Sequence, residues 1–358
     1  MLACDALVVG GGPAGSTCAR ALRQAGWDVV VMDRARFPRD KVCAGWLTTH
    51  VLRLLELDAD EYRGAGLTLQ EIAGFQTSVF GQRAVDNRYG RVVSYAIRRC
   101  EFDDFLLRRA EVRVLEAAPV STLRREGDAW IANDMVRAPV VIGAGGHFCP
   151  VARRLRRRDD TPAPVVAREA EFPLEGHSSV APGMPELLFC RDLEGYGWCV
   201  RKGNYINVGI GRRENHGFGA HVEEFMGFLE RSGKAPGASR ARWKGHAYLA
   251  SGTGARRLVE DGLVLIGDAA GLAYPESGEG IRPAVESGLL AAAALARAGR
   301  HPTADDLGGY ERELRARYPP SRSSRGSLDG PATALGRALL RSRAFTRHVV
   351  LDRWFLRN

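Results

Sequence analysis

The spacing of hydrophobic and polar positions in the first half of the chain predicts alternating strands and helices. Continuous apolar runs at 3–10 and 27–33 flank a helical pattern at 13–25, which is typical of a buried β-α-β unit in a parallel sheet. The same reasoning predicts further helices and strands at 49–57, 101–111, 112–117 and 138–146. We therefore expect a doubly wound α/β domain.

The pattern changes between residues 163 and 255. Short stretches there alternate apolar and polar side chains, as in "VVAREAEF" and "GYGWCVRKGNYINVGIGR", which indicates strands of a mostly antiparallel sheet. Residues 220–232 have the spacing of an amphipathic helix. At 256–300 the chain returns to a strand, turn and helix, so the antiparallel sheet is an insertion.

Composition narrows the class of protein. The 358 residues are 45% hydrophobic and 26% charged, which is ordinary for a globular chain. No apolar run is long enough for a membrane span, and the start has no secretion signal, so the expected location is the cytoplasm. The net charge of +9 comes almost wholly from arginine and suits anionic ligands, but no nucleic-acid reading element accompanies it.

Cysteine and histidine provide no evidence for a structural metal or a disulfide framework. The seven cysteines are odd in number and form no CxxC pair. The eight histidines show no paired ligand spacing, so we assign no metal. Among them, His147 and His246 are considered as proton donors, with a structural role as the alternative.

A glycine motif follows the first strand. Gly10, Gly12 and Gly15 have GxGxxG spacing, which allows a tight turn, close approach of the backbone to a pyrophosphate, and packing of the helix on the strand. Asp33 ends the next strand about 20 residues later, where an acidic residue binds a ribose. A glycine turn of any α/β protein is the alternative. The combination favours dinucleotide binding.

A second motif about 250 residues later has the same strand, turn and helix order. In "GLVLIGDAAGLAYPESGEGI", Asp268 stands at the turn and a helix begins near Gly280. The positive end of that helix would favour negative charge on a reduced cofactor. Together, the two motifs predict one FAD site formed from both ends of the chain.

These motifs carry a resemblance to a known group of flavoproteins. With "FPRDKVCAG" (37–45), "RRCEFDDFL" (98–106) and "VVIGAGG" (140–146), the chain resembles p-hydroxybenzoate hydroxylase-type FAD-dependent oxidoreductases and monooxygenases. Within this superfamily it is most similar to geranylgeranyl reductases. The resemblance implies a Rossmann-type FAD domain with an inserted, mostly antiparallel substrate-binding sheet and C-terminal helices.

The resemblance also implies domain boundaries and site residues. The FAD-binding domain would comprise 1–75, 95–162 and 256–300, the substrate-binding domain 76–94 and 163–255, and a helical segment 301–358. The FAD-binding residues would be Gly10, Gly12, Pro13, Ala14, Gly15, Asp33, Arg34, Cys43, Arg99, Gly267, Asp268, Gly278, Gly280 and Ile281. The residues lining the substrate cavity would be Tyr196, Trp198, Val200 and Arg201.

Three residues near the expected flavin are catalytic candidates: Lys41, Cys43 and Glu279. Lys41 could activate the Cys43 thiol, although a small residue packed against the flavin is the alternative. The geranylgeranyl reductases have a phenylalanine-proline pair where this chain has Val200 and Arg201, which weakens the inference of an unmodified isoprenoid substrate. The tryptophan-x-tryptophan-x-isoleucine-proline signature of halogenases is missing.

The C-terminal region predicts one basic amphipathic helix at about 332–356. Its leucines and aromatic residues stand among many arginines, so it could lie on a membrane surface or cover the fold with its apolar face.

The sequence as a whole predicts an FAD-dependent oxidoreductase acting on a hydrophobic small molecule. The favoured reaction is NAD(P)H-driven reduction of a C=C bond, with NAD(P)H docking transiently because one dinucleotide fold is present. Hydroxylation of an aromatic or electron-rich substrate by a monooxygenase remains open. So does a flavoprotein acting on a protein partner. The substrate and oligomeric state are left undetermined.

Overall fold

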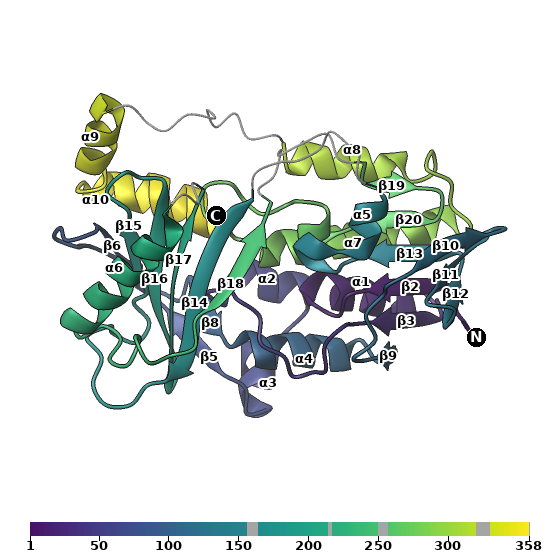
Figure 1. Ribbon diagram of the computed structural model, residues 1–358, viewed down its shortest axis with the longest axis horizontal. Helices are drawn as coiled ribbons and strands as arrows, with labels where there is room; N and C mark the ends of the chain where they lie inside the picture. Colours follow the sequence, from purple (N-terminus) through teal and green to yellow (C-terminus); the bar gives the residue numbers. More distant parts are fainter. Residues whose placement is uncertain (156–163, 214–216, 250–256, 320–329, 358) are drawn as a thin grey trace. The chain divides into compact units, whose positions relative to one another are not determined.

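The computed structural model describes residues 1–155, 164–213, 217–249, 257–319 and 330–357, and these residues form two compact units (Figure 1). Unit 1 comprises Met1–Asp40, Cys100–Ala163 and Tyr248–Ser321. Unit 2 comprises Lys41–Arg99, Pro164–Ala247 and Arg322–Asn358. Each unit is therefore assembled from three separate parts of the chain.

Unit 1 is built on a six-stranded sheet with the order β19-β20-β13-β2-β3-β9. Its strands are β2 (Ala6–Val9), β3 (Val29–Met32), β9 (Arg113–Leu115), β13 (Val140–Gly143), β19 (Val259–Glu260) and β20 (Leu263–Leu265). The strands from β20 to β9 run parallel, and β19 is an antiparallel edge strand. Every residue of β2 and β3 is buried, as expected for a parallel sheet covered on both faces.

Helices complete the core of unit 1. They are α1 (Pro13–Gln24), most of α4 (Arg99–Arg109), α5 (Pro150–Arg154), α7 (Ile281–Ala298) and α8 (Gly308–Arg317), with short helices η1 (Gly146–Phe148) and η2 (Gly267–Ala269). Small residues bring α1 and α7 close together, since a Cβ on Gly288 would lie 2.6 Å from the Ala14 carbonyl oxygen. A second sheet has the order β1-β12-β11-β10, formed by Leu2–Ala3, Val136–Ala138, Ala129–Ala132 and Leu123–Glu126.

Unit 2 contains a seven-stranded sheet with the order β18-β14-β17-β16-β15-β6-β7. The strands are β6 (Gly74–Val79), β7 (Val85–Arg88), β14 (Val165–Pro173), β15 (Glu186–Phe189), β16 (Gly195–Lys202), β17 (Tyr205–Arg212) and β18 (Lys244–Tyr248). Strands β14 to β17 pair antiparallel, and β15 pairs parallel with β6. Alternation along β16 divides its side chains between two apolar clusters, one on each face.

Smaller elements cover the two faces of this sheet. On one face lies α6 (Phe218–Arg231), whose Phe225 packs in the same cluster as Val208. On the other lie residues of β4 (Trp46–Thr48) and β5 (Leu69–Ile72), which pair with β8 (Ser94–Ile97), and of the C-terminal helices. The remaining helices of the unit are α2 (Thr49–Leu54), α3 (Ala59–Gly64), α9 (Gly330–Leu339), α10 (Arg343–Phe345) and η3 (Thr346–Leu356).

The predicted fold class is confirmed: a Rossmann-type sheet is accompanied by a mostly antiparallel sheet. Residues 41–75, which we assigned to the FAD-binding domain, pack in unit 2, so the functional domain boundaries stay a prediction. The region 332–356 differs from the single helix expected. Ser342 caps a new helix by accepting a hydrogen bond from the Phe345 N–H, so α9 ends before α10 begins. None of the helices in the described ranges is long and apolar enough to cross a membrane.

Candidate functional site

The turn between β2 and α1 explains why glycine stands at the first and last positions of the first motif. Gly10 has φ of +115°, and a Cβ on Gly15 would lie 1.9 Å from the Gly10 carbonyl oxygen. Gly12 caps α1 without a side-chain hydrogen bond, and Pro13 and Ala14 begin the helix, which has no acidic residue in its first turn. The N-terminus of α1 therefore offers backbone N–H groups and partial positive charge to an anion.

Asp33 holds the glycine turn in place. One carboxylate oxygen accepts the Gly11 N–H at 2.7 Å, and the other accepts the Ala35 N–H at 2.8 Å. The side chain is buried, whereas the neighbouring Arg34 is exposed. Because each carboxylate oxygen has a second lone pair, Asp33 retains the capacity to accept a ribose hydroxyl.

Arg39 joins this turn, a contact that the sequence did not predict. Its Nη2 lies 3.3 Å from the position of a Cβ on Gly12, which has no other neighbour within 4 Å in the described chain. The same nitrogen lies 3.2 Å from Oδ2 of Asp103, a fully buried carboxylate on α4. The sequence signal that could have indicated this contact is the basic residue in "FPRDK", the segment that follows the second strand. Arg39 adds positive charge where the backbone approach is open.

The second motif places Asp268 beside the start of α7. A Cβ on Gly280 would lie 3.1 Å from Oδ1 of Asp268. Gly267 has φ of +58°, and its N–H donates to the Ser287 hydroxyl at 2.9 Å. Gly280 is the N-cap of α7 and makes no side-chain cap itself, and the first turn of the helix begins at Ile281.

Both motifs meet within unit 1. A Cβ on Gly267 would lie 3.0 Å from the Cβ of Ala14, and Gly288 of α7 packs on the Ala14 carbonyl. Gly278 has φ of +66° and lies against Tyr248, since a Cβ there would be 2.2 Å from the tyrosine oxygen. The expectation that residues so far apart in sequence come together therefore agrees with the geometry.

Glu279 is engaged in the start of α7. Its Oε1 accepts the Arg282 N–H at 2.9 Å, and its backbone carbonyl accepts the Tyr274 N–H at 3.0 Å. These contacts give Glu279 a capping role for α7. Arg99, another predicted contact, is buried at the first position of α4.

The segment Lys41–Gly45 belongs to unit 2. Lys41 Nζ lies 2.8 Å from Nε2 of His246, a partner that sequence spacing did not reveal. The Gly45 N–H points to Cys43 Sγ at 3.4 Å. Gly45 has φ of +64°, and a Cβ would lie 2.2 Å from the Ile97 carbonyl oxygen, which explains why glycine ends the segment. The chain is tightly held here against β8.

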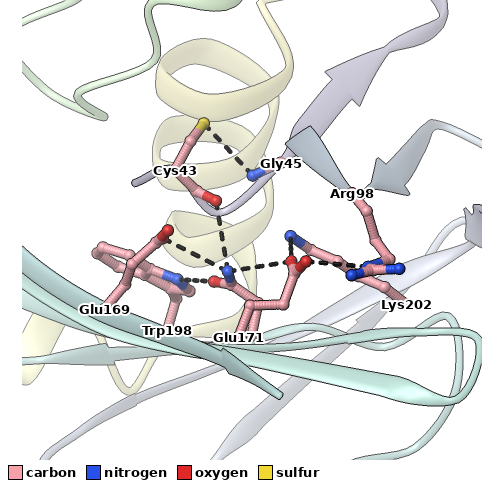
Figure 2. A network of polar contacts seen from close by, with 8 residues as sticks. Cys43, Gly45, Arg98, Glu169, Glu171, Trp198 and Lys202 are labelled. Atoms are coloured by element: carbon pink, nitrogen blue, oxygen red, sulfur yellow. Dashed lines mark hydrogen bonds and ion pairs between the residues drawn. The ribbon is translucent and has the colours of Figure 1, made fainter. Parts of the chain in front are cut away.

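A buried polar network lies directly beside this segment (Figure 2). Asn207 is its centre: its Nδ2 lies 3.4 Å from the Cys43 carbonyl oxygen and 3.4 Å from both Glu169 and Glu171, and its Oδ1 accepts the Trp198 indole N–H at 2.7 Å. The strand register places these side chains together, because Glu171 of β14 and Val200 of β16 both pair with Asn207 of β17.

The two carboxylates of the network have different partners. Glu171 accepts hydrogen bonds from Lys202 Nζ at 2.6 Å and Arg98 Nε at 3.1 Å. Burial opposes its charge, but the two cations hold the pKa of Glu171 below its usual range. Burial raises the pKa of Glu169 to about 7, against the attraction of Lys202 and the hydrogen bond from the Cys43 N–H. Glu169 therefore takes up or releases a proton near neutral pH.

The residues predicted to line a substrate cavity divide between the two faces of the sheet. Trp198 and Val200 belong to one apolar cluster, where the Tyr196 ring packs 5.4 Å from that of Phe355 in η3. Arg201 is at an intervening position, and its strand partner Ile206 lies in the other cluster. Arg201 thus lies on the opposite face from the side chains with which we grouped it.

The geometry of unit 1 fits a dinucleotide cofactor such as FAD. The open backbone at Gly12, the uncapped start of α1 and Arg39 suit a pyrophosphate, and Asp33 suits a ribose. The start of α7 beside Asp268, where the Glu279 carboxylate accepts the Arg282 N–H, suits the other end of such a cofactor. These residues come from segments that are remote in sequence and adjacent in unit 1.

Comparison with known protein families gives an independent result. Residues 5–102 match the family described as FAD dependent oxidoreductase. Menaquinone reductase of Mycobacterium tuberculosis strain H37Rv is 33% identical over 236 residues, which cover 58% of this chain and 54% of that protein. The chain thus spans about half the length of this relative. Digeranylgeranylglycerophospholipid reductase 1 of Methanosphaera stadtmanae is 26% identical over 289 residues, 76% of this chain and 70% of that protein.

Solved structures share the fold. A geranylgeranyl bacteriochlorophyll reductase-like protein from Thermoplasma acidophilum has a TM-score of 0.73 at 21% identity, covering 98% of this chain and 91% of the other. PqsL from Pseudomonas aeruginosa, a probable FAD-dependent monooxygenase, has a TM-score of 0.68 at 20% identity, covering 97% and 99%. At these identities the likeness establishes the architecture.

Proposed function

We propose that this chain, a member of the superfamily of FAD-dependent oxidoreductases that includes geranylgeranyl reductase-like proteins and monooxygenases, reduces a C=C bond of an isoprenoid lipid. FAD would be the bound cofactor, and NAD(P)H would dock transiently as the electron donor. The proposal extends the superfamily assignment to a reaction and a substrate class.

The observation that carries the choice of reaction is the extent of the sequence matches. Three matches to proteins named as reductases of menaquinone or of digeranylgeranylglycerophospholipid cover 58% to 87% of this chain, and a further menaquinone reductase matches over 14% of it. Matches to flavin-dependent halogenases cover 29% to 35%. Both reductase names denote isoprenoid lipids, so the substrate class follows the longer matches.

The position of Arg201 supports the same choice. In the sequence, the argument against an unmodified isoprenoid substrate was that Val200 and Arg201 replace a phenylalanine-proline pair, with an arginine that could either point away or meet an acidic group of the substrate. The side chain lies on the face of β16 that packs towards α6, away from Tyr196 and Trp198. The face that carries Trp198 and Val200 packs against the C-terminal helices and borders the polar network around Asn207, so the position of Arg201 removes one objection to a hydrocarbon substrate.

Within the proposed reaction, the chain binds and orients. Gly12, the start of α1 and Arg39 would hold the pyrophosphate, and Asp33 the ribose. The start of α7 would place partial positive charge beside the electron-carrying end of the cofactor. When bound, FAD would supply hydride chemistry. Aromatic side chains on the substrate side would orient the double bond and exclude water.

Product analysis tests the proposal and its main alternative. Purified protein loaded with FAD would be incubated with NADPH and either a polyprenyl quinone or a digeranylgeranyl glycerophospholipid, with and without oxygen. We expect a product that, after reoxidation of any quinol to the quinone, still carries two added hydrogen atoms in its isoprenoid chain and that forms under nitrogen. A product that gains one oxygen atom, and forms in air alone, would instead support the monooxygenase alternative. FAD-loaded protein that consumes NADPH with neither product would overturn the isoprenoid assignment.

The third alternative, a flavoprotein acting on a protein partner, gives a different result in the same samples. It predicts no lipid-stimulated NADPH oxidation and stoichiometric binding to a protein. The Gly12→Val variant serves as the control throughout, because it should remove FAD and with it any product that depends on the cofactor.

A further inference from the structure

Helix α9 exposes an apolar stripe along one side. Its members are spaced as one face of an α-helix and all are exposed: Pro331, Ala334, Leu335, Ala338 and Leu339. Leu335 is 62% exposed and Leu339 38%. In the described part of the chain, five large hydrophobic side chains have comparable exposure, and two of them stand on this one helix. Such a concentration is typical of a binding surface.

The other side of α9 is attached to unit 2. A Cβ on Gly336 would lie 2.5 Å from Leu193 Cδ1, so the backbone of the helix approaches this leucine closely. Leu340, the next residue after the helix, is buried in the apolar cluster that contains Phe355. The exposed stripe is therefore held on a folded support and faces outwards.

The segment that carries the stripe has charges of a single sign. Residues 330–351 contain four arginines and no aspartate or glutamate. Arg347 stacks on the ring of Tyr89 and lies near Asp352. The other three, Arg337, Arg341 and Arg343, make no ion pair with the residues that the structure describes. Positive charge is thus available on α9 and in the residues that directly follow it.

From this combination we infer that α9 is an interfacial helix that docks the protein on an anionic lipid bilayer. Leucine side chains would enter the boundary between head groups and acyl chains, and arginines would extend to the phosphates. The net charge of +9 adds long-range attraction to a negative surface. The partner is therefore expected to have an anionic surface over an apolar interior.

Charge also argues against a second copy of this chain as the occupant. A symmetric contact through α9 would bring the same arginines of both copies together, with no acidic residue at 330–351 to offset them. A bilayer containing anionic lipid supplies negative charge in any orientation. The inference goes beyond the proposed reaction and does not depend on it.

Vesicle co-sedimentation tests the inference with the full chain. Vesicles of phosphatidylcholine alone and of phosphatidylcholine mixed with phosphatidylglycerol would be compared at low and high salt. We expect binding to the mixed vesicles, with a strong decrease in about 1 M salt, where the screening length is about 3 Å. The double variant Leu335→Ser/Leu339→Ser should bind at least tenfold more weakly, since each leucine loses its burial.

Two further variants separate the contributions. Arg341→Gln/Arg343→Gln should lower the affinity on the order of twentyfold. Phe148→Ser, at a side chain 61% exposed on η1, is the matched control and should bind as the wild type does. Far-UV circular dichroism of each variant would establish that it is folded.

Three outcomes would overturn the inference. The first is the absence of binding to mixed vesicles by the folded wild type. The second is unchanged vesicle binding by the folded leucine variant, which would mean that charge alone causes the binding. The third is a lipid-free wild type that is dimeric while the leucine variant is monomeric, which would make α9 a self-association surface.

Discussion

Replacing Glu169 with glutamine should remove a pH dependence of stability that the buried network creates. Glutamine has the same shape and can still accept a hydrogen bond from the Cys43 N–H, but it cannot ionise. Glu169 has a pKa raised from its ordinary value of 4.5 to about 7, with burial as the main cause. Its carboxyl group is buried in β14, so solvent screening does not reduce the effect.

The sign follows from proton linkage. Between pH 4.5 and about 7 the folded protein retains this proton, whereas the unfolded chain has released it. The free energy of unfolding therefore falls by about 1.4 kcal/mol per pH unit across this interval and is constant above it. The total contribution of Glu169 is a loss of about 3 kcal/mol by neutral pH.

Urea unfolding of the wild type and Glu169→Gln at about pH 5, 6, 7 and 8 would measure this contribution. We expect the variant to gain stability relative to the wild type as the pH rises, by about 3 kcal/mol in all, and the difference to level off near pH 7. Carbon-13 NMR of labelled glutamate carboxyl groups in the folded protein would report the titration directly.

Glu171→Gln provides the matched control. The pKa of Glu171 is lowered despite burial, by Lys202 and Arg98 in particular, so its charge stabilises the fold at neutral pH. Its contribution is complete above the ordinary pKa of 4.5 and is lost only below it, so the cost of its replacement should be the same at every pH from about 5 to 8. Parallel stability curves for the wild type and Glu169→Gln between about pH 5 and 7 would refute the reasoning on the proton of Glu169.

Further predictions concern single contacts. Gly12→Val should yield colourless protein, because a branched side chain would block the approach of the pyrophosphate to the backbone. Gly309→Val is the control and should keep its FAD, because a Cβ at Gly309 meets nothing within 4 Å. Retention of full FAD by Gly12→Val would contradict the placement of the pyrophosphate. Trp198→Phe removes the indole N–H bonded to Asn207 and should lower the free energy of unfolding by about 1 to 3 kcal/mol in urea titration. Tyr318→Phe removes a buried hydroxyl bonded to a carboxylate of α7 and should lower stability by about 1.5 to 3 kcal/mol, and an unchanged melting curve would contradict this.

The parts of the fold and site that the sequence predicted have local causes. The turn between β2 and α1 requires glycine at positions 10 and 15. This part of the motif can therefore be predicted from the local sequence alone. Alternation in "GYGWCVRKGNYINVGIGR" predicted antiparallel strands, and the structure forms from it the hairpin β16–β17 with a positive φ at Gly203. The same alternation also predicts that Arg201 and Trp198 lie on opposite faces of the sheet, because an odd number of positions separates them along one strand.

The parts that were missed depend on distant contacts. Glu169 and Asn207 meet because β14 pairs with β17 in one register, which no local pattern specifies. Likewise, Lys41 lies beside His246 although about 200 residues separate them. The break between α9 and α10 had a local signal, the cap at Ser342, that a continuous amphipathic pattern concealed.

The contact between Ala14 and Gly288 has a consequence for synthesis of the protein. The first glycine motif leaves the ribosome early, but the helix against which it packs is made more than 250 residues later. Native contacts of such long range are typical of slow folding. Unit 1 can therefore mature only after most of unit 2 has been translated, and the nascent β2–α1 segment must remain free of aggregation until α7 arrives.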